Sequence, residues 1–161
     1  MVELDGRRLH ATLAAGAARV IGAQDHLNRI NVFPVADGDT GSNLAVTLYS
    51  MAQAVAVPLD AGLTMGAMAD AALLGARGNS GIIFAQFLDG FREKVSSLAT
   101  ISMAHFIRAV EHAARSASSA ISKPRDGTIL SVIRDWSAAL EAEGPRAVNY
   151  RELMNNSIPA A

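Results

Sequence analysis

The sequence predicts an all-α protein, an antiparallel helical bundle or barrel of six or seven helices, and three observations support this. Half of the 161 residues are hydrophobic but only 5% are aromatic, and alanine is abundant. Alanine has the highest helix propensity and lets helix axes approach closely. Runs of the β-branched and aromatic residues that form strands are scarce. Short turns separate stretches whose apolar residues recur every three or four positions, so neighbouring helices are expected to be antiparallel.

Four helices are expected in the first half of the chain. Asp5 can cap a first helix that runs to about Ile30 and carries an apolar stripe ending at that residue. A second helix is expected at about 43–54, and a third at about 61–76 after a cap at Asp60. A fourth follows residue 80, with apolar positions at 83, 84, 87, 88 and 91, which is the spacing of a helical face.

The second half predicts two or three more helices. One is expected from about Thr100 to 121, and another begins after a cap at Thr128. A short helix can follow Pro145 and end near Asn155. The sequence shows no internal repeat or domain boundary, so residues 1–161 are interpreted as a single domain. The inner face of the helix after Thr128 is expected to hold Ile129, Val132, Ile133, Trp136 and Leu140.

Composition argues against several classes of protein. The formal net charge of −1 gives no electrostatic reason to expect a nucleic-acid partner. The chain has no cysteine, which excludes disulfides and thiolate metal sites. No stretch approaches the ~20 apolar residues that span a bilayer, and the charged N-terminus does not resemble a secretory signal. A cytoplasmic protein without a membrane span is therefore expected.

The first polar loop, residues 31–43, places Asp37 and Asp39 on either side of a glycine. Two carboxylates this close repel each other unless a cation lies between them or one is protonated. Magnesium suits such a pair because it takes oxygen ligands, keeps waters and is often shared with substrate phosphates. From spacing alone, a turn that caps the next helix is an equal alternative. An EF-hand does not fit, because the glycine and glutamate that it needs are Ser42 and Leu48 here.

Two further glycine-bearing loops also precede helices, where free N–H groups favour phosphate. Residues 75–81 (GARGNSG) have glycines at spacings of three, which let the backbone pass close to an anion, and Ser80 can donate to phosphate. No Lys-Ser/Thr pair follows, so this is not a Walker A loop, and alone it is better explained as a turn between helices. Residues 126–128 (DGT) form the third loop, for which helix capping by Thr128 is the simplest explanation.

Taken together, the three loops resemble those of the DhaL-like domain family. The similarity lies in residues 27–30 (LNRI) followed by NVFPVADGDTGSN, in GARGNSG at 75–81, and in KPRDGTIL at 123–130, in the family's order. The family comprises the nucleotide-binding L subunit of dihydroxyacetone kinases and the N-terminal domain of fatty acid kinases. The NVFP version of the first loop is closer to the fatty acid kinase branch. The resemblance covers essentially the whole chain and implies a barrel of about eight helices.

The resemblance also implies a nucleotide site with ATP or ADP and two magnesium ions at one end of the barrel. Asp37 and Asp39 would be the catalytic metal ligands, and Asn31 stands where the dihydroxyacetone branch has a further metal-binding aspartate. Phosphate contacts would come from the starts of two helices and from the third loop. By resemblance, these nucleotide-binding residues are Thr40, Gly41, Ser42, Asn43, Gly78, Asn79, Ser80, Gly81 and Thr128.

The function implied is the ATP-binding component of a two-part kinase. It would transfer the γ-phosphate to a fatty acid carboxylate or to dihydroxyacetone, which a separate partner subunit presents. The alternative is a non-catalytic nucleotide-binding regulatory module, and a purely structural helical scaffold is a third possibility. Family members usually continue beyond the position of Ala161 into further helices, so the domain is expected to be incomplete at its C-terminus. Apolar surface left open in this way favours a homo-oligomer.

Overall fold

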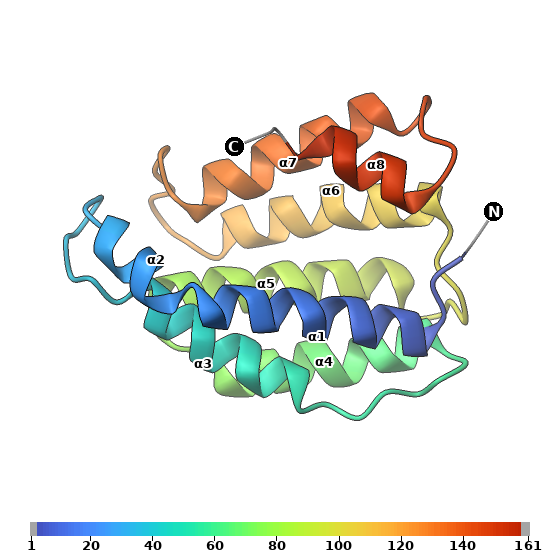
Figure 1. Ribbon diagram of the computed structural model, residues 1–161, viewed down its shortest axis with the longest axis horizontal. Helices are drawn as coiled ribbons and strands as arrows, with labels where there is room; N and C mark the ends of the chain where they lie inside the picture. The colour runs from blue at the N-terminus through green and yellow to red at the C-terminus, as the bar shows by residue number, and fades with distance from the viewer. Residues whose placement is uncertain (1–2, 159–161) are drawn as a thin grey trace.

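The computed structural model describes residues 3–158, and it is built from helices (Figure 1). Within that range the only extended pairing is an isolated antiparallel bridge between Leu4 and Ile101. The all-α prediction is therefore confirmed. The eight helices of the described range are α1 (Gly6–Gly22), α2 (Gln24–Ile30), α3 (Thr40–Ala52), α4 (Ala61–Gly75), α5 (Gly78–Val95), α6 (Met103–Ser119), α7 (Ile129–Glu143) and α8 (Tyr150–Ser157).

The described range has more helices than the six or seven expected because the first predicted helix is two helices. The chain turns at Ala23, whose N–H donates back to carbonyls of the last turn of α1, and α2 continues from there. Because of this break, the last residue of the predicted apolar stripe does not reach the core. Ile30, its last member, is consequently 57% exposed.

Side-chain caps set several helix starts where local sequence predicted them. Asp5 accepts a hydrogen bond from the N–H of Arg8, and Asp60 accepts one from Leu63, both at 2.8 Å. Thr128 caps α7 in the same way. The helix expected from Thr100 instead begins at Met103, because the Ser102 hydroxyl caps it.

The chain runs back and forth along the long axis of the molecule, so most neighbouring helices are antiparallel (Figure 1). α1, α3, α4 and α5 pack together in one layer, and α2 packs on α3. α6 packs against α5 and carries α7 on its other side, and α8 packs on α7. The molecule thus has two layers that meet where α5 contacts α6.

The two layers are filled by different residues. The α3–α4 region is packed with methionine and alanine, including the fully buried Met51, Met65 and Met68. The region between α5, α6, α7 and α8 holds an aromatic cluster whose neighbouring ring centroids are 5.5–6.4 Å apart. Its members are Phe84, Phe87, Phe91, Phe106, Trp136 and Tyr150.

The predicted inner face of α5 is confirmed, since all five of its apolar residues are buried or pack against the core. The prediction for α7 is wrong at Val132, which is 68% exposed. α7 packs chiefly on α6 and α8, and its contact with α5 is slight, so the side that carries Val132 is largely left open to solvent. No helix in residues 3–158 has both the length and the hydropathy to cross a bilayer.

Candidate functional site

The three loops singled out in the sequence gather at one end of the molecule, where α3, α5 and α7 all begin (Figure 1). The first two loops touch where the Ser80 hydroxyl donates to the carbonyl of Thr40, at 3.5 Å. The third meets the first at Gly127, where an added Cβ would lie 3.9 Å from the ring of Phe33. Three helix starts therefore present their partial positive charge to one region.

In the acidic bend, residues 37–39, the two aspartates are exposed and the glycine between them is half-buried. Gly38 has a φ of +66°, a left-handed conformation that lets the chain turn tightly between Asp37 and Asp39. Both aspartates are exposed, and neither carboxylate accepts a hydrogen bond from any donor in residues 3–158. Their oxygens are thus available to an external ligand.

The donor set limits which cation could bind there. In the described part of the chain, no group of three or more His, Asp or Glu side chains comes together. A cation at the bend would therefore have at most two protein carboxylates, and its other ligands would be neutral protein oxygens, waters or phosphate oxygens. This composition fits magnesium, which usually takes one or two carboxylates and keeps several waters. It does not fit a calcium cage.

The start of α3 is satisfied by two asparagines of the preceding segment. The Asn31 amide oxygen accepts hydrogen bonds from the N–H groups of Asp39 (3.1 Å) and Thr40 (3.0 Å) and from the Thr40 hydroxyl (2.8 Å). The Asn28 amide oxygen accepts from the N–H of Ser42 at 3.1 Å, and its NH₂ donates to the Ser42 hydroxyl at 3.0 Å. Most of the free N–H groups of this helix start are therefore used within the protein.

The start of α5 is different, because its N–H groups remain free. Arg77 stands at the N-cap position and makes no side-chain cap. In residues 3–158, the N–H groups of residues 78–80 have no protein acceptor, and the first bonded one is that of Gly81, which donates to the Arg77 carbonyl at 3.0 Å. Three free N–H groups at the start of an 18-residue helix are an arrangement that suits an anion.

The glycines of the second loop are explained by packing on α3. Gly78 has a φ of +56°, and an added Cβ would lie 2.1 Å from the Asn43 amide nitrogen. A Cβ on Gly81 would lie 2.4 Å from the hydroxyl of Thr47, which is fully buried. The glycines thus bring the start of α5 against α3, and this places its free N–H groups near the acidic bend.

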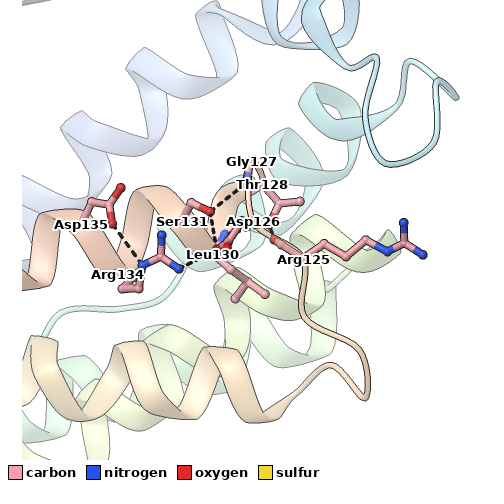
Figure 2. A network of polar contacts seen from close by, with 8 residues as sticks. All are labelled: Arg125, Asp126, Gly127, Thr128, Leu130, Ser131, Arg134 and Asp135. Atoms are coloured by element: carbon pink, nitrogen blue, oxygen red, sulfur yellow. Dashed lines mark hydrogen bonds and ion pairs between the residues drawn. The ribbon is translucent and has the colours of Figure 1, made fainter.

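The third loop is fixed by a polar network (Figure 2). Asp126 accepts hydrogen bonds from Arg134 at 2.6 Å and from the Ser131 hydroxyl at 3.5 Å, and the Gly127 N–H donates to the same hydroxyl at 2.8 Å. The Thr128 hydroxyl donates to the Arg125 carbonyl at 2.8 Å while it caps α7. Figure 2 shows the Arg125 side chain pointing away from this network. Arg134, which hydrogen-bonds and attracts the carboxylate, lowers the pKa of Asp126.

The lowered pKa predicts a pH-dependent contribution of Asp126 to stability. Because the folded state favours the ionised carboxylate, this contribution is present above the ordinary pKa of 3.8 and is lost as the pH falls through the lower folded value. Asp126→Asn should therefore lower Tm at neutral pH, and its difference from the unaltered chain should shrink below pH 3.8. Thermal unfolding measured between pH 7 and pH 2 tests this. Glu141→Gln, on the same helix, is the control and should give no such pH-dependent difference; a similar profile for it would contradict the assignment.

Comparison with known proteins identifies the family of the chain. Residues 34–161 match the model of the DAK2 domain, which covers most of the chain. The chain belongs to the DAK2 domain family. This DhaL-like domain is an ATP-binding domain of the dihydroxyacetone kinase family, so the predicted resemblance to the DhaL-like family is confirmed.

Full-length relatives are much longer than this DAK2 chain. Protein YloV of Bacillus subtilis is 37% identical over 134 residues, which are 82% of the chain and 24% of YloV. An uncharacterized protein of Staphylococcus saprophyticus is 34% identical over 94% of the chain and 28% of its own length. One from Staphylococcus epidermidis is 32% identical over 99% of the chain and 29% of its own length. The chain thus spans about a quarter of the curated relatives that it matches.

The structure brings most of the predicted DAK2 site residues to one end, and their roles in binding stay predictions. Thr40 and Ser42 are tied to asparagines, Gly41 packs on α2, and Asn43 packs on Gly78. No role was predicted for Asn28, Thr47, Ser131 or Arg134, although Asn28 lies within the motif at 27–30. Its contact with Ser42, fourteen positions away, depends on the packing of α2 on α3, which the local sequence does not reveal.

Proposed function

We propose that this chain is the magnesium-dependent, ATP-binding part of a two-part kinase, and that its acceptor is presented by a partner subunit. The supporting observation is the combination of two unused features at one end. Among the described residues, the start of α5 has three N–H groups without an acceptor, and the neighbouring acidic bend has two carboxylates without a donor. One feature suits phosphate oxygens, and the other suits the cation that accompanies them.

The residues of the chain have distinct roles in this proposal. The N–H groups of residues 78–80 bind the phosphate oxygens, assisted by the dipole of α5. Asp37 and Asp39 hold magnesium, which when bound neutralises charge on the phosphates. Thr128 borders the nucleotide from the third loop, whose shape Asp126 and Arg134 maintain.

Phosphoryl transfer depends mainly on positioned phosphates and neutralised charge. Both requirements can be met by groups on rigid helix starts. The acceptor would then be brought to the exposed side of the acidic bend. A fatty acid carboxylate is the favoured acceptor, because the NVFP loop is closer to the fatty acid kinase branch, and dihydroxyacetone is the alternative.

Isothermal titration of the chain with ATP tests the binding part of the proposal. Binding is expected with Mg²⁺ present and should weaken strongly when EDTA removes the metal. A folded sample that shows no magnesium-dependent binding would overturn the proposal. Consumption of ATP when fatty-acid-binding or dihydroxyacetone-binding proteins are added tests the kinase part, and persistent inactivity with intact binding would favour a regulatory module.

A further inference from the structure

We propose that Asn31 is a positioning residue, which holds the acidic bend through its amide oxygen, and that it is not itself a metal ligand. The inference rests on the proposed function, because the bend is held in place for a cation. It assigns metal binding in this chain to Asp37 and Asp39 alone. The position of Asn31 in the motif at 31–43 suggests a metal ligand, whereas this proposal makes it a positioning residue.

The amide oxygen of Asn31 has no free capacity in the structure. It accepts from the Asp39 N–H, the Thr40 N–H and the Thr40 hydroxyl at 2.8–3.1 Å, although an amide oxygen has only two lone pairs. The three donors also fix the orientation of the amide, since its NH₂ group could not accept from them. On the other side, the NH₂ group donates to the Val35 carbonyl at 3.1 Å.

These four hydrogen bonds enclose the acidic bend. Val35 lies before the bend, and Asp39 and Thr40 end it and begin α3. Asn31 therefore joins both ends of the segment that carries the two carboxylates. Residues held in this way around metal ligands commonly govern affinity without touching the metal.

A direct metal contact by Asn31 would break the hydrogen bonds that its amide oxygen accepts. The amide would have to turn, leaving the N–H groups of Asp39 and Thr40 without an acceptor at a helix start. Magnesium would gain little from an Asn31 ligand, because it keeps water at coordination positions that the protein does not fill. The chemistry therefore favours Asn31 as a clamp on the loop.

Asn28 provides a matched comparison. It caps the same helix, but the hydrogen bonds of its side chain within residues 3–158 go to Ser42, beyond the acidic bend. Loss of Asn28 should therefore weaken the helix start and leave the bend held by Asn31. The two asparagines separate general capping of α3 from positioning of the carboxylates.

The first experiment measures amide hydrogen exchange of residues 39 and 40 in the unaltered chain by NMR. Both amides are expected to be protected without metal, and to stay protected at saturating Mg²⁺. If Mg²⁺ accelerates exchange at Thr40, the amide of Asn31 has turned to the metal and the inference is overturned. Rapid exchange of both amides without metal would overturn it as well. This experiment needs no variant, so it decides the matter even if substitutions prevent folding.

The second experiment compares Asn31→Ala with Asn28→Ala. Both should lower the Tm of the metal-free chain by about 2–4 °C, the effect of a lost helix cap in a domain of this size. Only Asn31→Ala should also lower Mn²⁺ affinity about tenfold or more in a titration followed by EPR. An unchanged metal-free Tm with weakened Mn²⁺ binding in Asn31→Ala would identify a ligand and overturn the inference. If the unaltered chain binds no Mn²⁺, the proposed function fails, while the exchange data still show whether Asn31 holds the bend.

Discussion

Replacing both Asp37 and Asp39 with Asn is expected to lower the affinity for Mg²⁺ with ATP at least about 100-fold. A unit charge 4 Å from another contributes roughly 1 kcal/mol in water and about 4 kcal/mol near a protein surface, and a divalent cation doubles this. Loss of two such carboxylates therefore easily exceeds the ~2.7 kcal/mol that corresponds to 100-fold. Isothermal titration with ATP and Mg²⁺ measures the change. The fold should not suffer, because both side chains are exposed and accept no hydrogen bond from residues 3–158.

A matched control removes two other exposed carboxylates. Asp25→Asn with Glu141→Gln changes the net charge by the same amount, and both residues are exposed and lie outside the acidic bend. This variant should bind Mg²⁺ with ATP about as well as the unaltered chain. If the Asp37/Asp39 variant binds Mg²⁺ with ATP as well as the unaltered chain does, the bend is only a turn before α3. That result would favour the structural scaffold.

Gly41→Ala is expected to reduce the free energy of unfolding by about 2–4 kcal/mol, which is large for one methyl group. The added Cβ would lie 2.2 Å from the carbonyl oxygen of Gln24 and 2.8 Å from the amide oxygen of Asn28. The first contact is with backbone inside α2, so no side-chain rotation relieves it. α2 and α3 would have to separate, and the segment between them carries the acidic bend. Urea unfolding at fixed pH, without metal, measures the loss.

Gly16→Ala is the matched control for this substitution. Gly16 lies in the interior of α1, and an added Cβ would meet no atom within 4 Å. Alanine in a helix interior should there raise stability by up to about 1 kcal/mol. A loss of stability in both variants would show that the clash at Gly41 is not the cause.

Local signals in the sequence predicted most of the fold because they act within one turn. Asp5, Asp60 and Thr128 each cap a helix through an N–H two or three residues ahead, and such a pattern can be recognised without knowledge of the fold. The apolar face of α5 was predicted correctly for the same reason, since it follows from helical spacing.

The failures occurred where distant contacts decide. α3 was predicted to begin at about Asn43 but begins at Thr40, because Asn31 caps it from nine residues away. Val132 has the spacing of an inner residue, but burial depends on which helices lie beside α7. At the site, the sequence suggested that glycines 78 and 81 leave room for an anion. The structure shows that they also accommodate α3, through Asn43 and Thr47.

The three helix starts come from both layers, so a ligand bound to all three would couple the stability of the two layers. α3 and α5 belong to one layer, whereas α7 belongs to the other and reaches the first almost entirely through α6. A nucleotide bound by all three helix starts would connect the two layers in addition to the α5–α6 contact. By mass action it would stabilise their association, so opening of the α6–α8 layer would become rarer as nucleotide concentration rises. The bound molecule would then be part of what makes the protein unfold as one cooperative unit.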